Sequence, residues 1–485
     1  MVNWVIVVGL ILGITIFGIV WMGRREEKLI NIRPMAVAES FYPADKETLN
    51  KQLDSFLSQA EKVSSLKKPR IIIVPHAGTI YSGSTAAFAY KQLEGWNYKK
   101  IILLGVSHTK IIDYAAIDNN DGWKTPWGNL IIDKNLAEKI LSPTQKIVND
   151  SEVHAKDHNL EMQSIWIGKL FPKTKIVPIM LGQVSPELSS ALAFRIAQNM
   201  DEETLLIVSS DLSHYPNYET ANEVDKQTIE SIIKMDPKKF TGVGIETNAC
   251  GLEAIKIGIN VAKLLQMESP KLLKYQNSGD TSGDKSRVVG YGSIVIDADK
   301  LNLQVPKLDE KTKAEALQLA KKTLTEYLDK SATPTATIII SPLLYTPLGA
   351  FITIKNKEEL RGCIGEFEPS KPLYQVIAEK TIAAASRDQR FTPVKLTELP
   401  DLRVEISVMT PRQKVKSWEE IRLGIDGVVI QNGNRAGTFL PQVATETGWN
   451  RQEFLEQLCS QKAGLPKDCY KDPGTDIFIF QAEVF

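Results

Sequence analysis

Short apolar runs alternate with helical patterns between residues 70 and 298, and this alternation constrains the fold more than any other feature of the sequence. The runs read IIIVP, KIILLG, KIVPIML, TLLIVSS and, last, VVGYGSIVI. Strands that are apolar on both faces and separated by helices are typical of a parallel sheet covered by helices. We therefore predict an α/β domain with a mostly parallel sheet and flanking helices over residues 30–298.

The chain after this sheet has a different order of elements. Residues 299–309 lose periodicity and carry charge and proline, so we place an interdomain linker there. Residues 310–485 begin with a helical pattern. Further helices are expected near 373–386 and 450–460, and strands near 402–409 and 427–431. This order predicts a separate α+β domain.

The first 29 residues form a third segment with an apolar character of its own. An uncharged run of 19 residues extends from Trp4 to Met22, and a helix of that length crosses ~30 Å of hydrocarbon. The charged sequence GRREEK follows the run, whereas a cleaved signal peptide carries its positive charge before the apolar stretch. By the positive-inside rule, residues 1–29 predict a single-pass anchor with the N-terminus outside and both globular domains in the cytoplasm.

Charge and cysteine content exclude two classes of protein. Lysine plus arginine equals aspartate plus glutamate at 58 each, without long blocks of one sign, so the electrostatic footprint of a nucleic-acid-binding protein is missing. The four cysteines, Cys250, Cys363, Cys459 and Cys469, lie far apart and form no CxxC motif. This spacing excludes a zinc ribbon and a small disulfide scaffold, and favours reduced thiols.

All five histidines lie between residues 76 and 214. His76, His108 and His214 follow apolar runs directly, in IIIVPH, IILLGVSH and LLIVSSDLSH. Ligands of an open α/β sheet bind beyond the carboxyl ends of its strands, so we expect these three side chains to converge. A single histidine after a strand is usually a hydrogen-bonded loop residue, but three at one edge favour a binding site.

Other polar groups accompany these histidines. In DHNLEM, His158 and Glu161 share a helix face and could bind a metal or move a proton, although an ordinary surface helix explains the spacing equally well. In SSDLSH, Asp211 could orient the ring of His214 and fix its tautomer. Cys250 precedes an apolar helical run, and a helix N-terminus would stabilise its thiolate as a nucleophile or metal ligand. Most free cysteines, however, are inert core residues.

The motifs of the first domain resemble those of the Memo family. VAESFYP, PHAGTIYSGSTAAFAY, GVSHT, DHNLEMQ, SSDLSHY and ACG stand in the family's order over about residues 33–298. The resemblance implies a fold similar to the class III extradiol dioxygenases, which are non-heme iron enzymes that open catechol rings. It also implies a metal held by His76, His108 and Cys250, with Asp211 and His214 lining the same pocket.

This implied ligand set bears on the choice of metal. Two histidines and a thiolate differ from the two-histidine, one-carboxylate set that suits iron oxygenases, and a soft sulfur also favours copper or zinc. We expect Fe(II), with copper or zinc as alternatives, in an oxidoreductase with a dioxygenase-like site that acts on a small molecule or a peptide. In this hypothesis His214 transfers protons, oriented by Asp211, and His158 with Glu161 shapes the pocket.

Residues 310–485 resemble the AMMECR family through LRGCIGEFEP, AAASRDQRFTPV, LRVEISVMTP, DGVVIQNGNRAGTFLPQVA and GWNRQEFLEQLC. The two families occur with a radical S-adenosylmethionine protein in the AmmeMemoRadiSam group, which implies that protein as a partner. Cys363 in RGCIG is a candidate reactive thiol, but a small residue packed in a strand turn is an equal explanation. The alternative function is a non-catalytic scaffold that binds a metal or a peptide and brings the radical enzyme to the membrane.

Overall fold

The computed structural model of the chain describes residues 31–236, 249–301, 303, 308–330, 341–367, 371–415 and 417–485. The predicted anchor at residues 1–29 lies outside this part of the chain. Among the residues that are described, no helix is both long and apolar enough to cross a membrane.

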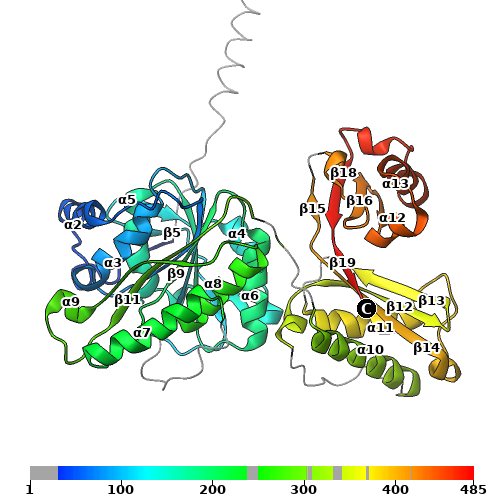
Figure 1. The fold of residues 1–485 in the computed structure, drawn as a ribbon, viewed down its shortest axis with the longest axis horizontal. Helices are drawn as coiled ribbons and strands as arrows, with labels where there is room; N and C mark the ends of the chain where they lie inside the picture. Colours follow the sequence, from blue (N-terminus) through cyan, green and yellow to red (C-terminus); the bar gives the residue numbers. More distant parts are fainter. Residues whose placement is uncertain are drawn as a thin grey trace, which may run out of the picture.

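The first domain is built on a large central sheet (Figure 1). The sheet has eight strands in the order β10-β11-β2-β9-β3-β8-β4-β7. The four central strands run parallel to one another: β2 (Pro69–Val74), β9 (Thr204–Ser209), β3 (Lys100–Val106) and β8 (Lys175–Leu181). The four outer strands are β10 (Lys271–Asn277) and β11 (Gly290–Asp297) on one side, and β4 (Ala115–Ile117) and β7 (Ile147–Asn149) on the other. The predicted α/β fold is confirmed, with a sheet that is parallel at its centre and turns antiparallel where β11 joins β2 and β4 joins β8.

Helices cover both faces of this sheet (Figure 1). One face carries α2 (Lys46–Gln59), α3 (Thr79–Gln92) and α5 (Asn159–Leu170). The other face carries α4 (Lys134–Ile140), α6 (Pro186–Asn199) and α8 (Leu252–Leu264). Successive strand residues point to opposite faces, so Ile71 and Ile73 pack in one apolar core and Ile72 and Val74 in the other.

Capping side chains explain where several of these helices begin. Asp45 accepts a hydrogen bond from the backbone N–H of Thr48 and so caps α2. Ser185 caps α6 in the same way, and the following Pro186 occupies the first helical turn, where its missing N–H costs nothing. α7 (Tyr218–Ile233) begins after Asn217, whose side chain accepts from Thr220.

The carboxyl ends of the central strands lie in register. Val74 of β2 pairs with Ser209 of β9, and Leu104 of β3 pairs with Val208 of β9. The loops that follow these strands therefore leave the sheet at one edge, which is where ligands of such sheets bind.

The second domain contains two four-stranded sheets (Figure 1). The first sheet has the order β13-β12-β14-β19, and α10 (Glu310–Lys330) and α11 (Leu373–Ser386) pack against it. Its strands are β12 (Gly349–Asn356), β13 (Glu359–Glu366), β14 (Leu402–Met409) and β19 (Ala482–Val484). This part agrees with the predicted α+β order.

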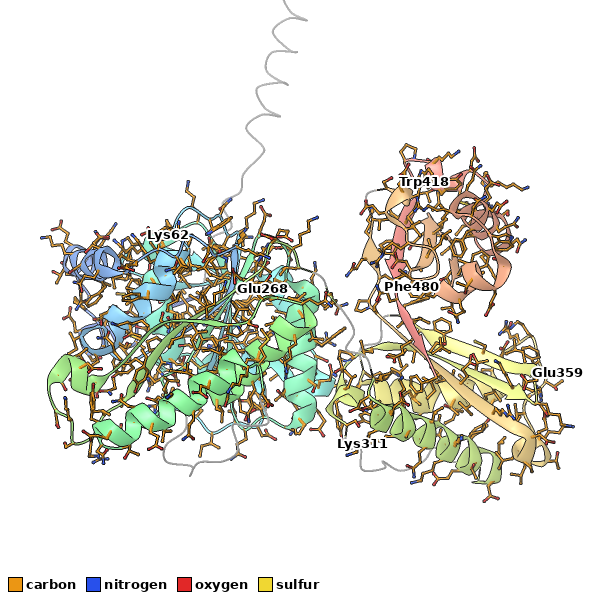
Figure 2. All side chains as sticks on the ribbon, in the orientation of Figure 1. Lys62, Glu268, Lys311, Glu359, Trp418 and Phe480 are labelled. Atoms are coloured by element: carbon orange, nitrogen blue, oxygen red, sulfur yellow. A yellow bond between two sulfur atoms is a disulfide. The ribbon has the colours of Figure 1, made fainter. Side chains whose placement is uncertain are left out.

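The second sheet of this domain has the order β15-β18-β16-β17. Its strands are β15 (Gln413–Lys414), β16 (Gly427–Asn432), β17 (Arg435–Phe439) and β18 (Asp476–Phe480). The helices α12 (Pro441–Thr447) and α13 (Arg451–Gln457) share an apolar core with this sheet. Phe480 lies where the two sheets meet (Figure 2), in a small apolar cluster with Met409 and Val429. The domain is therefore two lobes joined by an apolar contact.

Cys459 and Cys469 form a disulfide, so the prediction of reduced thiols is wrong for this pair. The chain turns back after α13 and brings the two Cα atoms to 5.9 Å, and both residues are buried. Their separation of 10 residues gave no motif in the sequence, because the turn that joins them is a property of the folded lobe. Cys250 and Cys363 are free thiols.

A short 3-10 helix, η5 (Pro342–Tyr345), connects the two domains by packing against α6 of the first domain and α11 of the second. Leu344 is fully buried in the apolar core that also contains residues of α6. The side chain of Gln145 donates a hydrogen bond to the carbonyl of Tyr345 at 3.4 Å. The core on this face of the large sheet thus continues into the second domain.

Candidate metal centre

Three loops at the carboxyl edge of the large sheet bring His76, His108 and His158 together. One ring nitrogen from each lies within 4.8 Å of the others. The ring centroids of His76 and His108 are 5.1 Å apart, those of His108 and His158 4.6 Å, and those of His76 and His158 5.4 Å. His76 is buried, His158 half-buried and His108 exposed, so the cluster opens to solvent at His108. Imidazole nitrogens in this arrangement suit iron, copper, zinc or nickel.

His76 is held where β2 ends. Its backbone N–H donates to the carboxylate of Asp211 at 2.7 Å, and its ring Nδ1 lies 3.1 Å from the hydroxyl of Ser209. Burial, and then the neighbouring rings of His108 and His158, hold the pKa of His76 well below its usual value. The ring is therefore neutral at neutral pH, which is the form that binds metals.

Asp157 holds the other two histidines in place, and sequence reasoning did not select it. Its carboxylate accepts hydrogen bonds from the backbone N–H groups of His108 at 2.6 Å and Asn159 at 3.0 Å. Its Oδ1 also lies 3.6 Å from Nδ1 of His108 and 3.9 Å from Nδ1 of His158. Burial alone would raise the pKa of Asp157, but the hydrogen bonds from His108 and Asn159 lower it to about 2. The available signal was its position directly before His158.

Cys250 contacts this cluster through one histidine. Its Sγ lies 3.3 Å from Nε2 of His76, and the cluster of three closely spaced ligands does not include it. The expectation of a stabilised thiolate is wrong for the metal-free protein, because burial, and then the charge of Asp211, raises the pKa of Cys250 to about 12. Gly251 lets α8 begin this close to β9, since a Cβ there would lie 2.6 Å from the Cβ of Ser210.

Asp211 and His214 line the same edge but do not form the pair that the sequence suggested. Asp211 accepts from the backbone N–H groups of His76 and Ala77, and its Oδ2 lies 4.0 Å from Nε2 of His76. Burial raises the pKa of Asp211. Nδ1 of His214 lies 2.8 Å from the carbonyl oxygen of Leu212, so a backbone carbonyl orients this ring. A carbonyl only accepts, so Nδ1 carries the hydrogen and Nε2 is free to accept.

Glu161 lies outside the histidine cluster, although it was expected to shape the pocket with His158. Its buried carboxylate pairs with the guanidinium of Arg33 at 2.7 Å and accepts from the hydroxyl of Tyr42 at 2.7 Å. The backbone N–H groups of Ala36 and Val37 also donate to it. The first turn of α5 directs Glu161 toward the segment around Arg33, and these contacts depend on a pairing that helix spacing does not encode.

Exposed apolar side chains lie close in sequence to residues of the site. Ile80 and Tyr81, at the start of α3, are 66% and 41% exposed, and Ile111, three residues after His108, is 96% exposed. Tyr215, next to His214, is 60% exposed, and the guanidinium of Arg287 lies 4.9 Å from its ring centroid. These exposed apolar groups are candidates for contact with a ligand or a partner.

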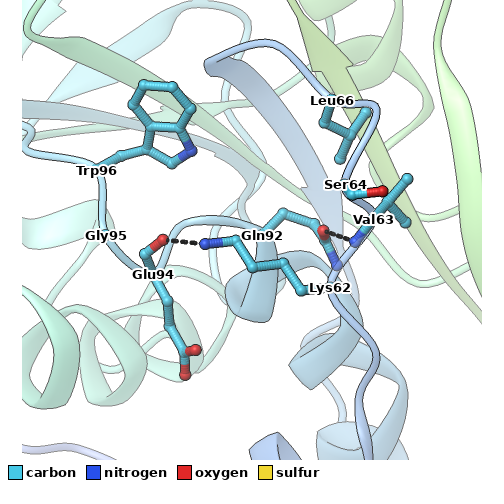
Figure 3. Close-up of a pocket in the computed structure, with 8 residues that line it drawn as sticks. All are labelled: Lys62, Val63, Ser64, Leu66, Gln92, Glu94, Gly95 and Trp96. Atoms are coloured by element: carbon cyan, nitrogen blue, oxygen red, sulfur yellow. Dashed lines mark hydrogen bonds between the residues drawn. The ribbon is translucent and has the colours of Figure 1, made fainter.

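A separate surface cavity of about 400 Å³ lies between the turn after α2 and the end of α3 (Figure 3). Its lining residues are Lys62, Val63, Ser64, Leu66, Gln92, Glu94, Gly95 and Trp96. The ammonium of Lys62 donates to the carbonyl of Glu94 at 2.6 Å, and Gln92 accepts from the N–H of Val63 at 2.9 Å. These hydrogen bonds connect the two sides of the cavity. Its lining contains no histidine or cysteine.

Cys363 lies on β13, the edge strand of its sheet. Its backbone N–H donates to Asp388 at 2.8 Å, its carbonyl accepts from Arg390 at 3.2 Å, and the hydroxyl of Thr353 lies 3.3 Å from its sulfur. The Asp388–Arg390 pair covers backbone groups that an edge strand would otherwise expose. These contacts explain a small residue at this position without assigning it a reaction.

Comparisons with known proteins divide the chain in the same way. The family model described as Memo-like protein matches residues 33–295, and the AMMECR1 model matches residues 317–485. A MEMO1 family protein of Sulfurisphaera tokodaii is 37% identical over 280 residues, covering 54% of this chain and 98% of the relative. A MEMO1 family protein of Aquifex aeolicus is 36% identical over 274 residues, covering 55% of this chain and all of the relative.

Two further similarities were found. A protein of Methanothermobacter thermautotrophicus is 49% identical over 143 residues, which is 28% of this chain and 74% of the relative. The crystal structure of an uncharacterized protein from Pyrococcus horikoshii is 37% identical, covers 35% of this chain and 88% of that chain, and has a TM-score of 0.33.

Proposed function

Because the chain belongs to the Memo-like family and carries an AMMECR1 domain after the Memo-like one, we propose that its first domain is a metal centre held by His76, His108 and His158. The observation that carries the proposal is the spacing of three imidazole nitrogens within 4.8 Å. Three separate loops supply these rings. The backbone N–H of His108 is hydrogen-bonded to Asp157, and the backbone N–H of His76 is hydrogen-bonded to Asp211.

The donor atoms suit a transition metal. Imidazoles bind iron, copper and zinc, and the sulfur of Cys250, 3.3 Å from Nε2 of His76, adds a soft donor that a bound cation would convert to a thiolate. We propose Fe(II) as the resident ion, with copper or zinc as alternatives for the same donors. Bound Fe(II) would supply redox or oxygen chemistry to the pocket.

The reaction we propose is that of a metal-dependent, dioxygenase-like oxidoreductase acting on a small molecule or a peptide. Nε2 of His214, left free by the hydrogen bond of Nδ1 to Leu212, can accept a proton from a bound substrate. Asp211 holds the backbone of His76 while His108 leaves the pocket open to solvent. The exposed rings of Tyr81 and Tyr215 offer apolar contacts to the substrate.

The exposed apolar residues close in sequence to the histidines also favour a second candidate, a non-catalytic scaffold. Ile80, Ile111 and Tyr215 are exposed by more than half, which suits a protein or peptide partner better than a small ligand. In this proposal the metal shapes the surface. The partner we propose under both functions is the radical S-adenosylmethionine protein of the AmmeMemoRadiSam group.

Metal analysis of the full chain, purified without oxygen and loaded with Fe(II), tests the centre. We expect about one ion per chain in the parent protein and loss of stoichiometric iron in His76→Ala and His158→Ala, because three donors grip an ion far better than two. Lys110→Ala, an exposed residue of the loop that carries His108, is the matched control and should keep the iron. Full iron in both histidine variants, or none in the parent, would contradict the proposal.

Oxygen uptake separates the two candidates. The iron-loaded protein is mixed with catechols and with peptides, and oxygen consumption and products are followed. Turnover that disappears in His76→Ala supports the oxidoreductase. If no substrate causes oxygen consumption or product formation, and the protein binds the radical enzyme with an affinity that falls in Tyr215→Ser, the scaffold is supported.

Membrane attachment through Trp4 to Met22 is a further proposal, based on the apolar run in the sequence. Fractionation of cells that express the full chain, or the chain from Asn31 onward, tests it. We expect the full chain in the membrane fraction and the shorter chain in the soluble fraction. Both forms in the soluble fraction would refute the anchor.

A further inference from the structure

We infer that Gln163 and Ser209 set the tautomer of His76, so that Nδ1 carries the proton and Nε2 is the atom offered to a metal ion. Both residues are buried, at 0% exposure; Ser209 contacts the ring of His76, and Gln163 contacts Ser209. The consequence for metal binding rests on the proposed metal centre. The tautomer itself is a property of the metal-free protein and can be measured without an ion.

The side-chain amide of Gln163 has its orientation fixed by a neighbour that can only accept. Nε2 of Gln163 lies 3.0 Å from the carbonyl oxygen of Pro75, where an amide oxygen would face another oxygen. The amide oxygen therefore points the other way, 2.8 Å from the hydroxyl of Tyr90, which donates to it. The second hydrogen of Nε2 is directed at Oγ of Ser209, 2.8 Å away.

The hydroxyl of Ser209 can then only accept a hydrogen bond from His76. A hydroxyl carries one hydrogen and two lone pairs, and one lone pair already accepts from Gln163. The carbonyl oxygen of Asn159, 3.3 Å from Oγ, can only accept and takes the hydrogen. What remains for Nδ1 of His76, at 3.1 Å, is a lone pair, so Nδ1 donates. A neutral imidazole with hydrogen on Nδ1 has its lone pair on Nε2.

The surroundings of the other ring nitrogens agree with this assignment. Nε2 of His76 lies 3.3 Å from the sulfur of Cys250, and a thiol donor there requires a lone pair on Nε2. Nδ1 of His108 and Nδ1 of His158 lie 3.6 Å and 3.9 Å from the carboxylate of Asp157. All three rings thus turn Nδ1 toward a protein oxygen, an arrangement that orients histidine ligands in metal sites.

Nitrogen-15 NMR of the full chain, labelled at histidine and free of metal, measures the tautomer at neutral pH. In the parent protein we expect the proton of His76 on Nδ1. Ser209→Ala removes the acceptor, so the ring should become a mixture of both tautomers, and affinity for Zn²⁺ should fall about 10–100-fold. Gln163→Leu should act in the same direction, because Ser209 loses the donor that fixes its hydroxyl.

Tyr90→Phe is the matched control for the loss of a buried hydrogen bond. The substitution removes the hydroxyl that donates to the amide oxygen of Gln163, but Pro75 still orients that amide. The tautomer of His76 and the affinity for Zn²⁺ should therefore stay as in the parent protein. A parent protein with the proton on Nε2, or a Ser209→Ala variant with the parent tautomer, would overturn the inference. If the tautomers change as expected in a chain that binds neither Fe(II) nor Zn²⁺, the roles of Gln163 and Ser209 are supported and only the proposed metal centre is refuted.

Discussion

Arg33 and Glu161 form a buried ion pair that joins the segment before α2 to the helix that follows His158. The charged atoms are 2.7 Å apart and both side chains are 1% exposed. Glu161→Gln keeps the shape of the side chain but leaves the guanidinium buried without a counter-charge. We expect it to lower the free energy of unfolding by about 3–5 kcal/mol, measured by urea denaturation.

An exposed pair provides the comparison for this loss. Lys99 and Glu203 are 2.7 Å apart, but their side chains are 63% and 43% exposed. Glu203→Gln should change the free energy of unfolding by at most about 1 kcal/mol, because solvent screens the pair. Similar losses in both variants would show that burial does not strengthen the Arg33–Glu161 pair.

Cys250 should be unreactive in the folded, metal-free protein. Burial raises the pKa of this thiol to about 12, so its reactive thiolate form is scarce at any pH well below that value. We expect iodoacetamide at pH 8 to leave Cys250 unmodified in the folded chain and to modify it after unfolding in urea, as measured by mass spectrometry of peptides. Fast modification of folded Cys250 would contradict the raised pKa of this thiol.

The sequence predicted part of this site at the level of single residues. His76 and His108 were found because each follows an apolar strand, and strand ends meet at one edge of a parallel sheet. The role of Asp157 could not be derived in the same way, because it acts through backbone N–H groups of a loop distant in sequence. Glu161 has the spacing of a ligand, but its partner Arg33 is 128 residues away.

At the scale of elements, the edge strand β13 is covered by the segment between Asp388 and Glu398. Arg361 of β13 makes two hydrogen bonds with Glu398, at 2.7 Å and 2.9 Å, and also donates to the carbonyl of Thr392 at 2.9 Å. Asp388 takes the outward N–H of Cys363. The segment therefore occupies the position that another strand could otherwise take.

The Arg361–Glu398 pair makes stability depend on pH with a defined sign. The hydrogen bonds of Arg361 lower the pKa of Glu398 to about 2, from ~4.3 in an unfolded chain. A lowered folded-state pKa stabilises the protein above the unfolded value, and this contribution disappears as pH falls from ~4.3 through about 2. Glu398→Gln should lower the free energy of unfolding by roughly 1 kcal/mol at pH 7 and make it depend less on pH.

Urea unfolding of the parent and of Glu398→Gln across this acid range measures the difference. Other carboxylates titrate in both proteins, so only the gap, which is the difference in the free energy of unfolding between the two proteins, reports on Glu398. We expect the gap to close as the pH falls. A gap that is constant with pH would contradict the ion pair.

Prediction from sequence was uneven at this scale for physical reasons. The central strands were recognised because burial on both faces makes them continuously apolar. The antiparallel pairing of β11 with β2 and of β4 with β8 could not be predicted, because strand direction depends on how the connections pack. β4 and β7, with 3 residues each, are too short to give a periodic pattern.

At the scale of the whole molecule, the two domains share an apolar core through η5. Leu344 is fully buried in the core that contains residues of α6, and it lies beside Tyr345, whose carbonyl accepts from Gln145 of the first domain. A charge at this position would be buried without a partner and would separate the domains. We therefore expect the stability of one domain to depend on contact with the other.

Leu344→Asp tests this dependence by differential scanning calorimetry. We expect the parent chain to unfold with strongly overlapping transitions, and the variant to show two separate transitions with the second domain melting earlier. Zn²⁺ should then raise the transition temperature of the domain that contains His76 and leave that of the second domain unchanged, since a ligand stabilises the unit to which it binds. Leu360→Asp, at a position of β13 that is 39% exposed, is the control and should keep the parent profile. If Leu344→Asp also keeps the parent profile, the contact between η5 and α6 does not couple the domains.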